Sequence, residues 1–147
     1  MATSNAATTY LEHALLDFLF KNNSETFASP GDSIYIGLAT AVADAEAGTL
    51  TEVNTSTQDA NYARQQVTAA NWTVTSVGTD AQTAKNSAAI EYAASSGIAS
   101  YTVTHVFVAD ASTSGNILFV GALDASKTIA SGDIFRINTN NLTIELK

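Results

Sequence analysis

The chain has 147 residues, no cysteine, six basic and fourteen acidic side chains, and a formal net charge of −8. A chain of this length forms one domain and buries enough surface to fold without a metal or a disulfide, so we treat residues 1–147 as a single domain. The missing thiols exclude disulfides, zinc–thiolate sites and thiol nucleophiles, and the acidic surface argues against nucleic acids and anionic membranes as partners.

An arm and one amphipathic helix are predicted at the N-terminus. Residues 1–8 are expected to form a flexible or extended arm, without the basic and apolar regions of a secretory signal. Thr9 and Glu12 have the spacing of a capping box, and residues 9–22 are the helix that it begins. The apolar residues in this stretch have the spacing of one helix face, namely Tyr10, Leu11, Ala14, Leu15, Phe18 and Leu19.

The hydrophobic period changes from 3.6 to 2 after the helix. Apolar residues at every second position from 34 to 38 indicate a half-buried strand. Residues 41–60 are acidic, small and rich in threonine, and we expect them to form a long exposed loop. Strand character returns over residues 64–75, and residues 76–87 are predicted to be a second polar loop.

The clearest strand signals lie in the C-terminal half. Residues 101–109 and 117–123 are rich in β-branched and aromatic side chains, and the polar stretch 110–116 between them is typical of a turn. Shorter strands are predicted at 88–93, 134–137 and 142–146. Residues 33–146 therefore form a mainly β domain, an antiparallel β-sandwich or barrel-like fold of about seven strands behind one helix.

Two motifs that could carry chemistry are better explained as turns. Gly31-Asp32-Ser33-Ile34 resembles the nucleophile block of the GDSL-type hydrolases, but those enzymes need a histidine three residues after an aspartate near the C-terminus. The last histidine here is His105, and Thr102 stands three residues before it. Asp110 begins a stretch similar to a calcium-binding EF-hand loop, but Gly121 stands where the bidentate glutamate belongs. We predict a protein that is not an enzyme and has no cofactor or metal site.

The large aromatic side chains have two interpretations. Trp72, Tyr62 and Tyr35 could form a stacking platform for a sugar, which would make the chain a carbohydrate-binding module. Large aromatic rings in a β-sandwich are more often part of the core. The same choice applies to His105, which we expect on one strand face with Val103 and Phe107. A core or interface histidine is a better interpretation there than a metal ligand or a general base.

Arg64 is the most unusual charged residue of the sequence. It lies in NYARQQVT (61–68), beside a tyrosine and two glutamines, in a chain with few basic residues. A buried or interfacial guanidinium needs several acceptors, which Gln65, Gln66 and the acidic loop before them can supply. We predict that Arg64 anchors that loop or bridges subunits, with anion binding as the alternative. The structural or interface candidates are therefore Tyr62, Arg64, Trp72 and His105.

Five blocks of the sequence are distinctive as an ordered set. They are YLEHALLDFLFKN (10–22), IYIGLATA (34–41), NYARQQVT (61–68), VTHVFVADASTSGNILFVGAL (103–123) and SKTIASGDIFRINTNNLTIEL (126–146). Together they resemble a family of small tailed-bacteriophage virion structural proteins, often described as tail fibre proteins. The resemblance implies a non-enzymatic structural protein of the virion, made in the host cytoplasm.

The position on the virion is a separate expectation. Because the chain is short and has no repeats or heptads, we expect a capsid cement (decoration) protein on the head surface. A tail or tail-fibre component is the alternative. Cement proteins commonly act as trimers, so a homo-oligomer, with a trimer favoured, is expected to bind the major capsid protein; in the alternative the partners are tail proteins.

Overall fold

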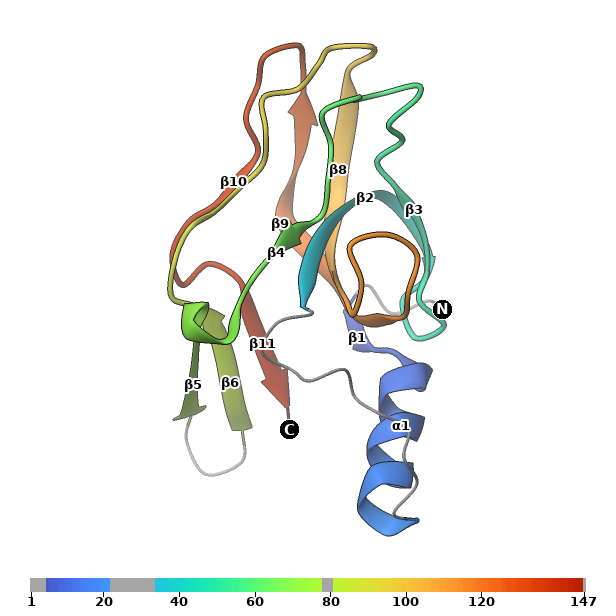
Figure 1. The fold of residues 1–147 in the computed structure, drawn as a ribbon, viewed down its shortest axis with the longest axis vertical. Coiled ribbons are helices and arrows are strands. Elements are labelled where there is room, and N and C mark those ends of the chain that lie inside the picture. Colours follow the sequence, from blue (N-terminus) through green and yellow to red (C-terminus); the bar gives the residue numbers. More distant parts are fainter. Residues whose placement is uncertain (1–4, 22–33, 78–80, 147) are drawn as a thin grey trace.

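The structure is a computed structural model that describes residues 5–21, 34–77 and 81–146. It is mainly β, with one helix near the N-terminus and antiparallel strand pairs (Figure 1), which confirms the predicted fold class. The helix is α1 (Thr9–Phe20), and a short 3-10 turn is η1 (Ala69–Asn71). The strands are β1 (Ala6–Ala7), β2 (Tyr35–Asp44), β3 (Thr49–Glu52), β4 (Gln65–Gln66), β5 (Trp72–Val77), β6 (Ala81–Asn86), β7 (Ile90–Glu91), β8 (Tyr101–Ala109), β9 (Ile117–Ile129), β10 (Arg136–Ile137) and β11 (Thr143–Leu146).

One main sheet and two smaller sheets make up the domain. The main sheet has the order β1-β9-β8-β2-β3, and β4 pairs with β2 beside this path. The smaller sheets have the orders β10-β7 and β11-β6-β5 and lie to the left of the main sheet in Figure 1. The strand count exceeds the expected seven because β1, β3 and β6 were not predicted, and because the strand predicted over 64–75 is divided into β4 and β5.

The central strands of the main sheet, β2 and β8, pack on both faces, so two cores flank the sheet. Ile36 and Leu38 of β2 belong to the larger core, whereas Ala39 of the same strand packs with Phe107 in the smaller one. All three β2 residues are fully buried. The expected half-buried strand is therefore buried on its second face as well, because a bulky aromatic ring from β8 covers that face.

Two predicted loops are wrong. Within 41–60, β2 continues to Asp44 and β3 pairs with it, and within 76–87 the strand β6 pairs with both β5 and β11. Neither β3 nor β6 has an alternating apolar pattern, and both were therefore predicted as parts of loops. In β6, cross-strand polar contacts contribute to the pairing. Thr83 of β6, which is 4% exposed, donates to the Thr75 carbonyl at 3.1 Å.

The N-cap of helix α1 lies one residue before the predicted cap. Thr8, not Thr9, is the N-cap, since its Oγ1 accepts from the Leu11 amide at 3.4 Å and donates to the Ile117 carbonyl at 2.6 Å. Thr8 is favoured because one hydroxyl both caps the helix and ties it to β9. The helix ends at Phe20, and residues 22–33, which hold the predicted helix end and the Gly31-Asp32-Ser33 block, lie outside the described residues.

Candidate functional site

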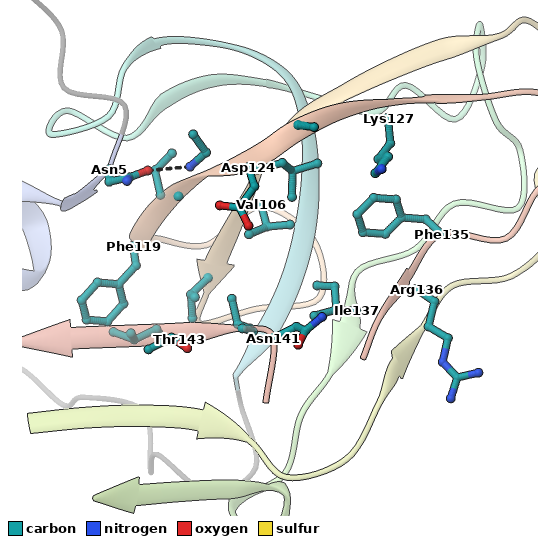
Figure 2. A pocket seen from close by; sticks show the side chains of 18 of the residues that line it. Asn5, Val106, Phe119, Asp124, Lys127, Phe135, Arg136, Ile137, Asn141 and Thr143 are labelled. Atoms are coloured by element: carbon teal, nitrogen blue, oxygen red, sulfur yellow. Dashed lines mark hydrogen bonds between the residues drawn. The ribbon is translucent and has the colours of Figure 1, made fainter. Parts of the chain in front are cut away.

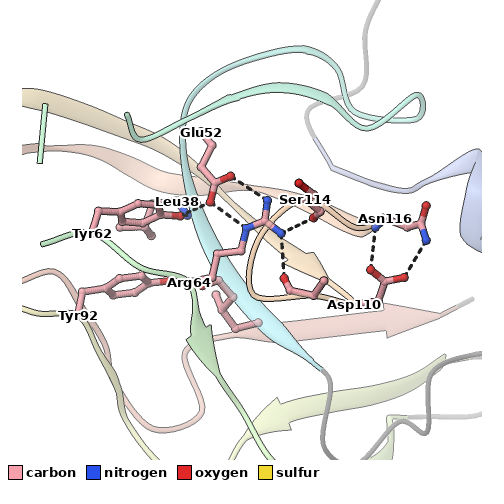
Figure 3. A network of polar contacts seen from close by, with 10 residues as sticks. Leu38, Glu52, Tyr62, Arg64, Tyr92, Asp110, Ser114 and Asn116 are labelled. Atoms are coloured by element: carbon pink, nitrogen blue, oxygen red, sulfur yellow. Dashed lines mark hydrogen bonds and ion pairs between the residues drawn. The ribbon is translucent and has the colours of Figure 1, made fainter. Parts of the chain in front are cut away.

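The guanidinium of Arg64 lies at the centre of a buried polar cluster (Figure 3). Its Nε and Nη2 donate to the two carboxylate oxygens of Glu52 at 2.9 and 2.8 Å, a bidentate pair. Its Nη1 donates to the carbonyls of Ala111 and Ser114 at 2.9 and 2.7 Å. The Arg64 side chain is only 7% exposed. Four of the five N–H donors are therefore used within the chain, which leaves little capacity for an external anion.

Tyr62 extends this cluster into the main sheet. Its hydroxyl donates to Glu52 at 2.8 Å and accepts from the Leu38 amide of β2 at 2.9 Å. Burial raises the pKa of this phenol above its ordinary value, so it stays neutral and can donate. The hydrogen bonds that Arg64 donates to Glu52, in contrast, raise the pKa of Arg64 and keep it charged. The carboxylate of Glu52 in β3 thus connects to Tyr62 and Arg64 directly and, through the Tyr62 hydroxyl, to the backbone of β2.

The guanidinium of Arg64 lies over the face of the Phe107 ring. The Arg64 Cζ lies 5.0 Å from the ring centroid, within the range of a cation–π contact. Phe107 is paired with Gly37 on β2, and a Cβ built at Gly37 would overlap with the tip of its ring. The glycine is required here for space, because the ring lies across the strand where a side chain would stand.

The segment between Glu52 and Arg64 is held by a second buried carboxylate. Asp59 is 2% exposed and accepts from the amides of Asn61 and Ser96 at 3.0 and 2.9 Å and from the Tyr101 hydroxyl at 3.0 Å. Burial alone would raise the pKa of Asp59, but the Ser96, Asn61 and Tyr101 hydrogen bonds outweigh it and hold the pKa below its ordinary value of 3.8. The expected exposed loop is therefore held against the domain by the side chains of Glu52 and Asp59.

The turn at 110–116 completes the cluster from the other side. Asp110 accepts from the backbone amide of Asn116 at 2.7 Å and from its side-chain amide at 2.8 Å (Figure 3). Ser114 and Gly115 have φ values of 54° and 71°, the left-handed conformation that closes the turn. The Asp110 carboxylate thus accepts hydrogen bonds within the turn between β8 and β9. This is the arrangement of a turn between two strands, whereas an EF-hand loop joins two helices. The turn holds the two carbonyls that accept from Arg64 in place.

The predicted aromatic and histidine candidates occupy separate environments. Tyr62 stacks on Tyr92 with ring centroids 6.1 Å apart, and Trp72 packs partly buried on the larger core with its Nε1 donating to the Val67 carbonyl at 3.4 Å. Tyr35 lies half-buried in β2. Only Tyr62 of these three rings joins the Arg64 cluster shown in Figure 3.

His105 does not share a face with Val103, which corrects the expectation. A register shift between Val103 and His105 in the β8–β9 pair turns the strand, so that Val103 belongs to the larger core and Phe107 to the smaller one. The His105 Nδ1 lies 2.8 Å from the Thr104 hydroxyl, and burial lowers the pKa of the ring. A bulge of this kind reverses the alternation on which the prediction depended.

The sequence indicated Gln65, Gln66 and the acidic stretch before them as sources of acceptors for Arg64. Glu52 lies within that stretch, but the sequence did not single it out or indicate the two carbonyls. Glu52 is one of fourteen acidic residues, and no sequence motif distinguishes it from the others as a partner for Arg64. The carbonyls of Ala111 and Ser114 lie 47 and 50 residues away along the chain. No local pattern could have indicated them, because they reach Arg64 only through the order of the strands.

The side chains of the cluster bind one another and hold neighbouring segments in place. Glu52 accepts three hydrogen bonds, and within the residues that the structure describes no three His, Cys, Asp or Glu side chains are grouped to hold a metal ion. A pocket of about 390 Å³ beside the cluster is lined by residues of the same segments, including Asn54 and Ser112.

In the described part of the chain, no helix has the length and apolar character that crossing a membrane requires.

Comparison with known proteins identifies one family. A family model described as Podophage GP4 fiber I protein gp80 matches residues 6–145 of the chain. The match includes all four predicted candidates, the Arg64 cluster and helix α1. No curated protein matches the chain.

Proposed function

The chain belongs to the Podophage GP4 fiber I protein gp80 family, and from this membership we propose that it is a structural subunit of a phage tail fibre. The single observation that carries the proposal is the match of residues 6–145, which is nearly the whole chain. The printed description names a fibre, so it favours the tail-fibre alternative over the capsid cement protein that we expected first. Both interpretations place the protein in the virion.

The Arg64 cluster supports a structural role. Its charged groups are satisfied by one another and by backbone carbonyls, so their effect is to fix the segment 53–63 and the turn 110–116 against the main sheet. A rigid surface loop lowers the conformational entropy that is lost on binding a partner. This is the property that a subunit of a permanent assembly needs, and it involves no substrate.

The position on the virion can be tested by labelling. Gold-conjugated antibody raised against the purified chain is applied to intact virions and examined by electron microscopy, with antibody pre-absorbed on the chain as the control. Label at the tail is the expected result. Label spread over the head would replace the proposal with the capsid cement role, and particles without specific label would contradict both.

A further inference from the structure

Strand β5 lies at one edge of the three-stranded sheet β11-β6-β5. Among the described residues it pairs only with β6, in a register that is continuous from Trp72 to Val77. In Figure 1, β5 is the outermost strand of this sheet, on the side away from α1. The lower part of Figure 2 shows β11, which carries the labelled Thr143, followed by β6 and then β5. In the described part of the chain, the second side of β5 is therefore a backbone edge with no strand beside it.

The alternation of an antiparallel ladder shows which backbone groups of β5 face this edge. The Ser87 amide donates to the Asn71 carbonyl at 2.8 Å, directly before the first residue pair of β5 and β6. The hydrogen-bonded pairs with β6 therefore continue at every second residue of β5 from residue 73 onwards. The N–H and C=O groups of Trp72, Val74 and Ser76 consequently point away from β6. Each of these residues offers one donor and one acceptor to a further strand.

The β5 edge lacks the features that keep a sheet edge from pairing. Edges are commonly protected by charged side chains, by proline or by a bulge. The β5 sequence WTVTSV contains no ionisable side chain and no proline, and its pairing with β6 has no register shift. The other described edges that are four residues or longer contain acids, namely Glu52 in β3, Glu145 in β11 and Asp124 in the part of β9 beyond β1. Val74, at the middle of the β5 edge, is apolar and 71% exposed.

The outward-facing residues are arranged symmetrically about Val74, which favours a second β5 strand as the occupant of the edge. When two β5 strands lie antiparallel with Val74 opposite Val74, Trp72 of each copy lies opposite Ser76 of the other. Outward-facing residues then meet only outward-facing residues, and each of these pairs exchanges two backbone hydrogen bonds. A shift of one residue would set outward-facing residues against inward-facing ones and lose these bonds.

The side chains of β5 also match their own copies in this register. Val74 meets Val74 on one face, and the exposed Thr73 meets the exposed Thr75 on the other. Thr83 donates its proton to the Thr75 carbonyl at 3.1 Å, so Thr75 is the donor in the 3.2 Å contact between the two hydroxyls. The Thr75 oxygen keeps a lone pair for the Thr73 hydroxyl of the second copy. Cross-strand pairs of β-branched side chains and of threonines stabilise antiparallel sheets.

We propose that β5 of one copy pairs antiparallel with β5 of a second copy about a two-fold axis at Val74, which joins two three-stranded sheets into one. The same residues serve both copies, so the contact is isologous and closed. A strand pair alone buries less than the roughly 800 Å² per partner of a standard interface, so its affinity is low in solution and increases where an assembly holds the copies together. A two-fold contact does not by itself produce the trimer expected from the family resemblance. The inference goes beyond the proposed function, since the contact does not depend on where the subunit lies on the virion.

Opposite charges at residue 74 test the contact in the purified full chain. Val74→Lys and Val74→Glu each place two like charges opposite each other, so each should raise the dissociation constant of the dimer about tenfold or more. An equal mixture of the two variants places lysine opposite glutamate and should form a mixed dimer. Ile98→Lys is the matched control, because it adds the same charge at an apolar residue that is 50% exposed and outside β5. Sedimentation equilibrium up to about 1 mM measures association, and circular dichroism confirms folding.

A single cysteine tests the register directly, because the chain has no cysteine of its own. Hydrogen-bonded antiparallel pairs have Cα atoms about 5.5 Å apart, a distance that a disulfide can span. Val74→Cys should therefore form a covalent dimer under mild oxidation, even where the free dimer is only partly populated. Ile98→Cys is the control and should form a covalent dimer much more slowly.

Three results would each overturn the proposal. They are a wild-type chain that is monomeric at every concentration, a Val74→Lys protein that associates as the wild type does, and a covalent dimer that forms no faster at residue 74 than at residue 98. A lysine–glutamate mixture without a mixed dimer would exclude the two-fold register. Tail label without association through residue 74 contradicts only this inference, whereas head label with that association intact contradicts only the proposed fibre function.

Discussion

The Arg64 cluster and helix α1 depart in opposite directions from the usual placement of polar and apolar side chains. Arg64 has a full charge and is 7% exposed at its side chain, whereas Phe20 is apolar and 81% exposed. The charge can be buried because Glu52 and two carbonyls satisfy it inside the chain. The ring of Phe20 is exposed at the end of a projecting helix. The first region therefore completes the fold, whereas the second leaves apolar side chains outside the core.

Removal of Arg64 is expected to have the largest effect on this comparison. Arg64→Ala leaves the half-buried Glu52 without its bidentate partner and two carbonyls without their donor, so the free energy of unfolding falls by about 3 kcal/mol. Urea denaturation measures the change. Arg136→Ala is the matched control, because its 3.5 Å pair with Glu91 is 54% exposed on both sides and is worth only about 0–1 kcal/mol. Equal losses in the two variants would show that the burial of the cluster does not matter.

The close approach of Phe107 to β2 gives the next largest effect. Gly37→Ala places a methyl group against the ring that supports Arg64, and we expect a loss of about 1–3 kcal/mol from overpacking. Gly121→Ala in β9 is the control, because nothing lies within 4 Å of its added Cβ. Thermal melts of the two variants should therefore differ clearly. A Gly37→Ala protein as stable as Gly121→Ala would contradict the steric account.

Acid should weaken the fastening of the loop at Asp59. The folded-state pKa of this carboxyl lies below its ordinary value of 3.8, so its stabilising contribution is present above that value and is lost as the pH falls through the folded-state pKa. Asp59→Asn removes this titration. The difference in unfolding free energy between wild type and Asp59→Asn should be constant near neutral pH and shrink below about pH 4. A difference that does not change between pH 5 and pH 2.5 would exclude this role.

The smallest effect on folding is expected at the outer face of α1. Leu19→Gln should change the unfolding free energy by no more than about 0.5 kcal/mol at concentrations where the chain is monomeric, because Leu19 is 60% exposed. Ala14→Gln on the same helix is the control, since Ala14 is 4% exposed and a larger side chain there costs about 1–3 kcal/mol. If Leu19→Gln proved the more damaging change, the outer face of α1 would belong to the fold of the subunit.

Strands with strong local signals could be predicted, and strands without them could not. Tyr101 to Ala109 was predicted with its observed bounds, because β-branched and aromatic side chains dominate it. β6 was predicted as part of a loop because AQTAKN has almost no such residues. Its strand conformation depends on pairing with β5 and β11, which flank it in the sheet but not in the local pattern. The bulge before His105 was unpredictable for the same reason.

Residue types, their order and short-range periodicity were enough to indicate the excluded classes of site, the position of one N-terminal helix, the mainly β class and the family resemblance. The tertiary structure decided which carboxylate pairs with Arg64, which glycine makes room for Phe107 and which face of α1 is exposed. Those outcomes depend on residues that meet only after β2 and β8 pair side by side. A local sequence pattern indicates the kind of environment that a side chain requires, whereas the order of the strands determines which residues contact it.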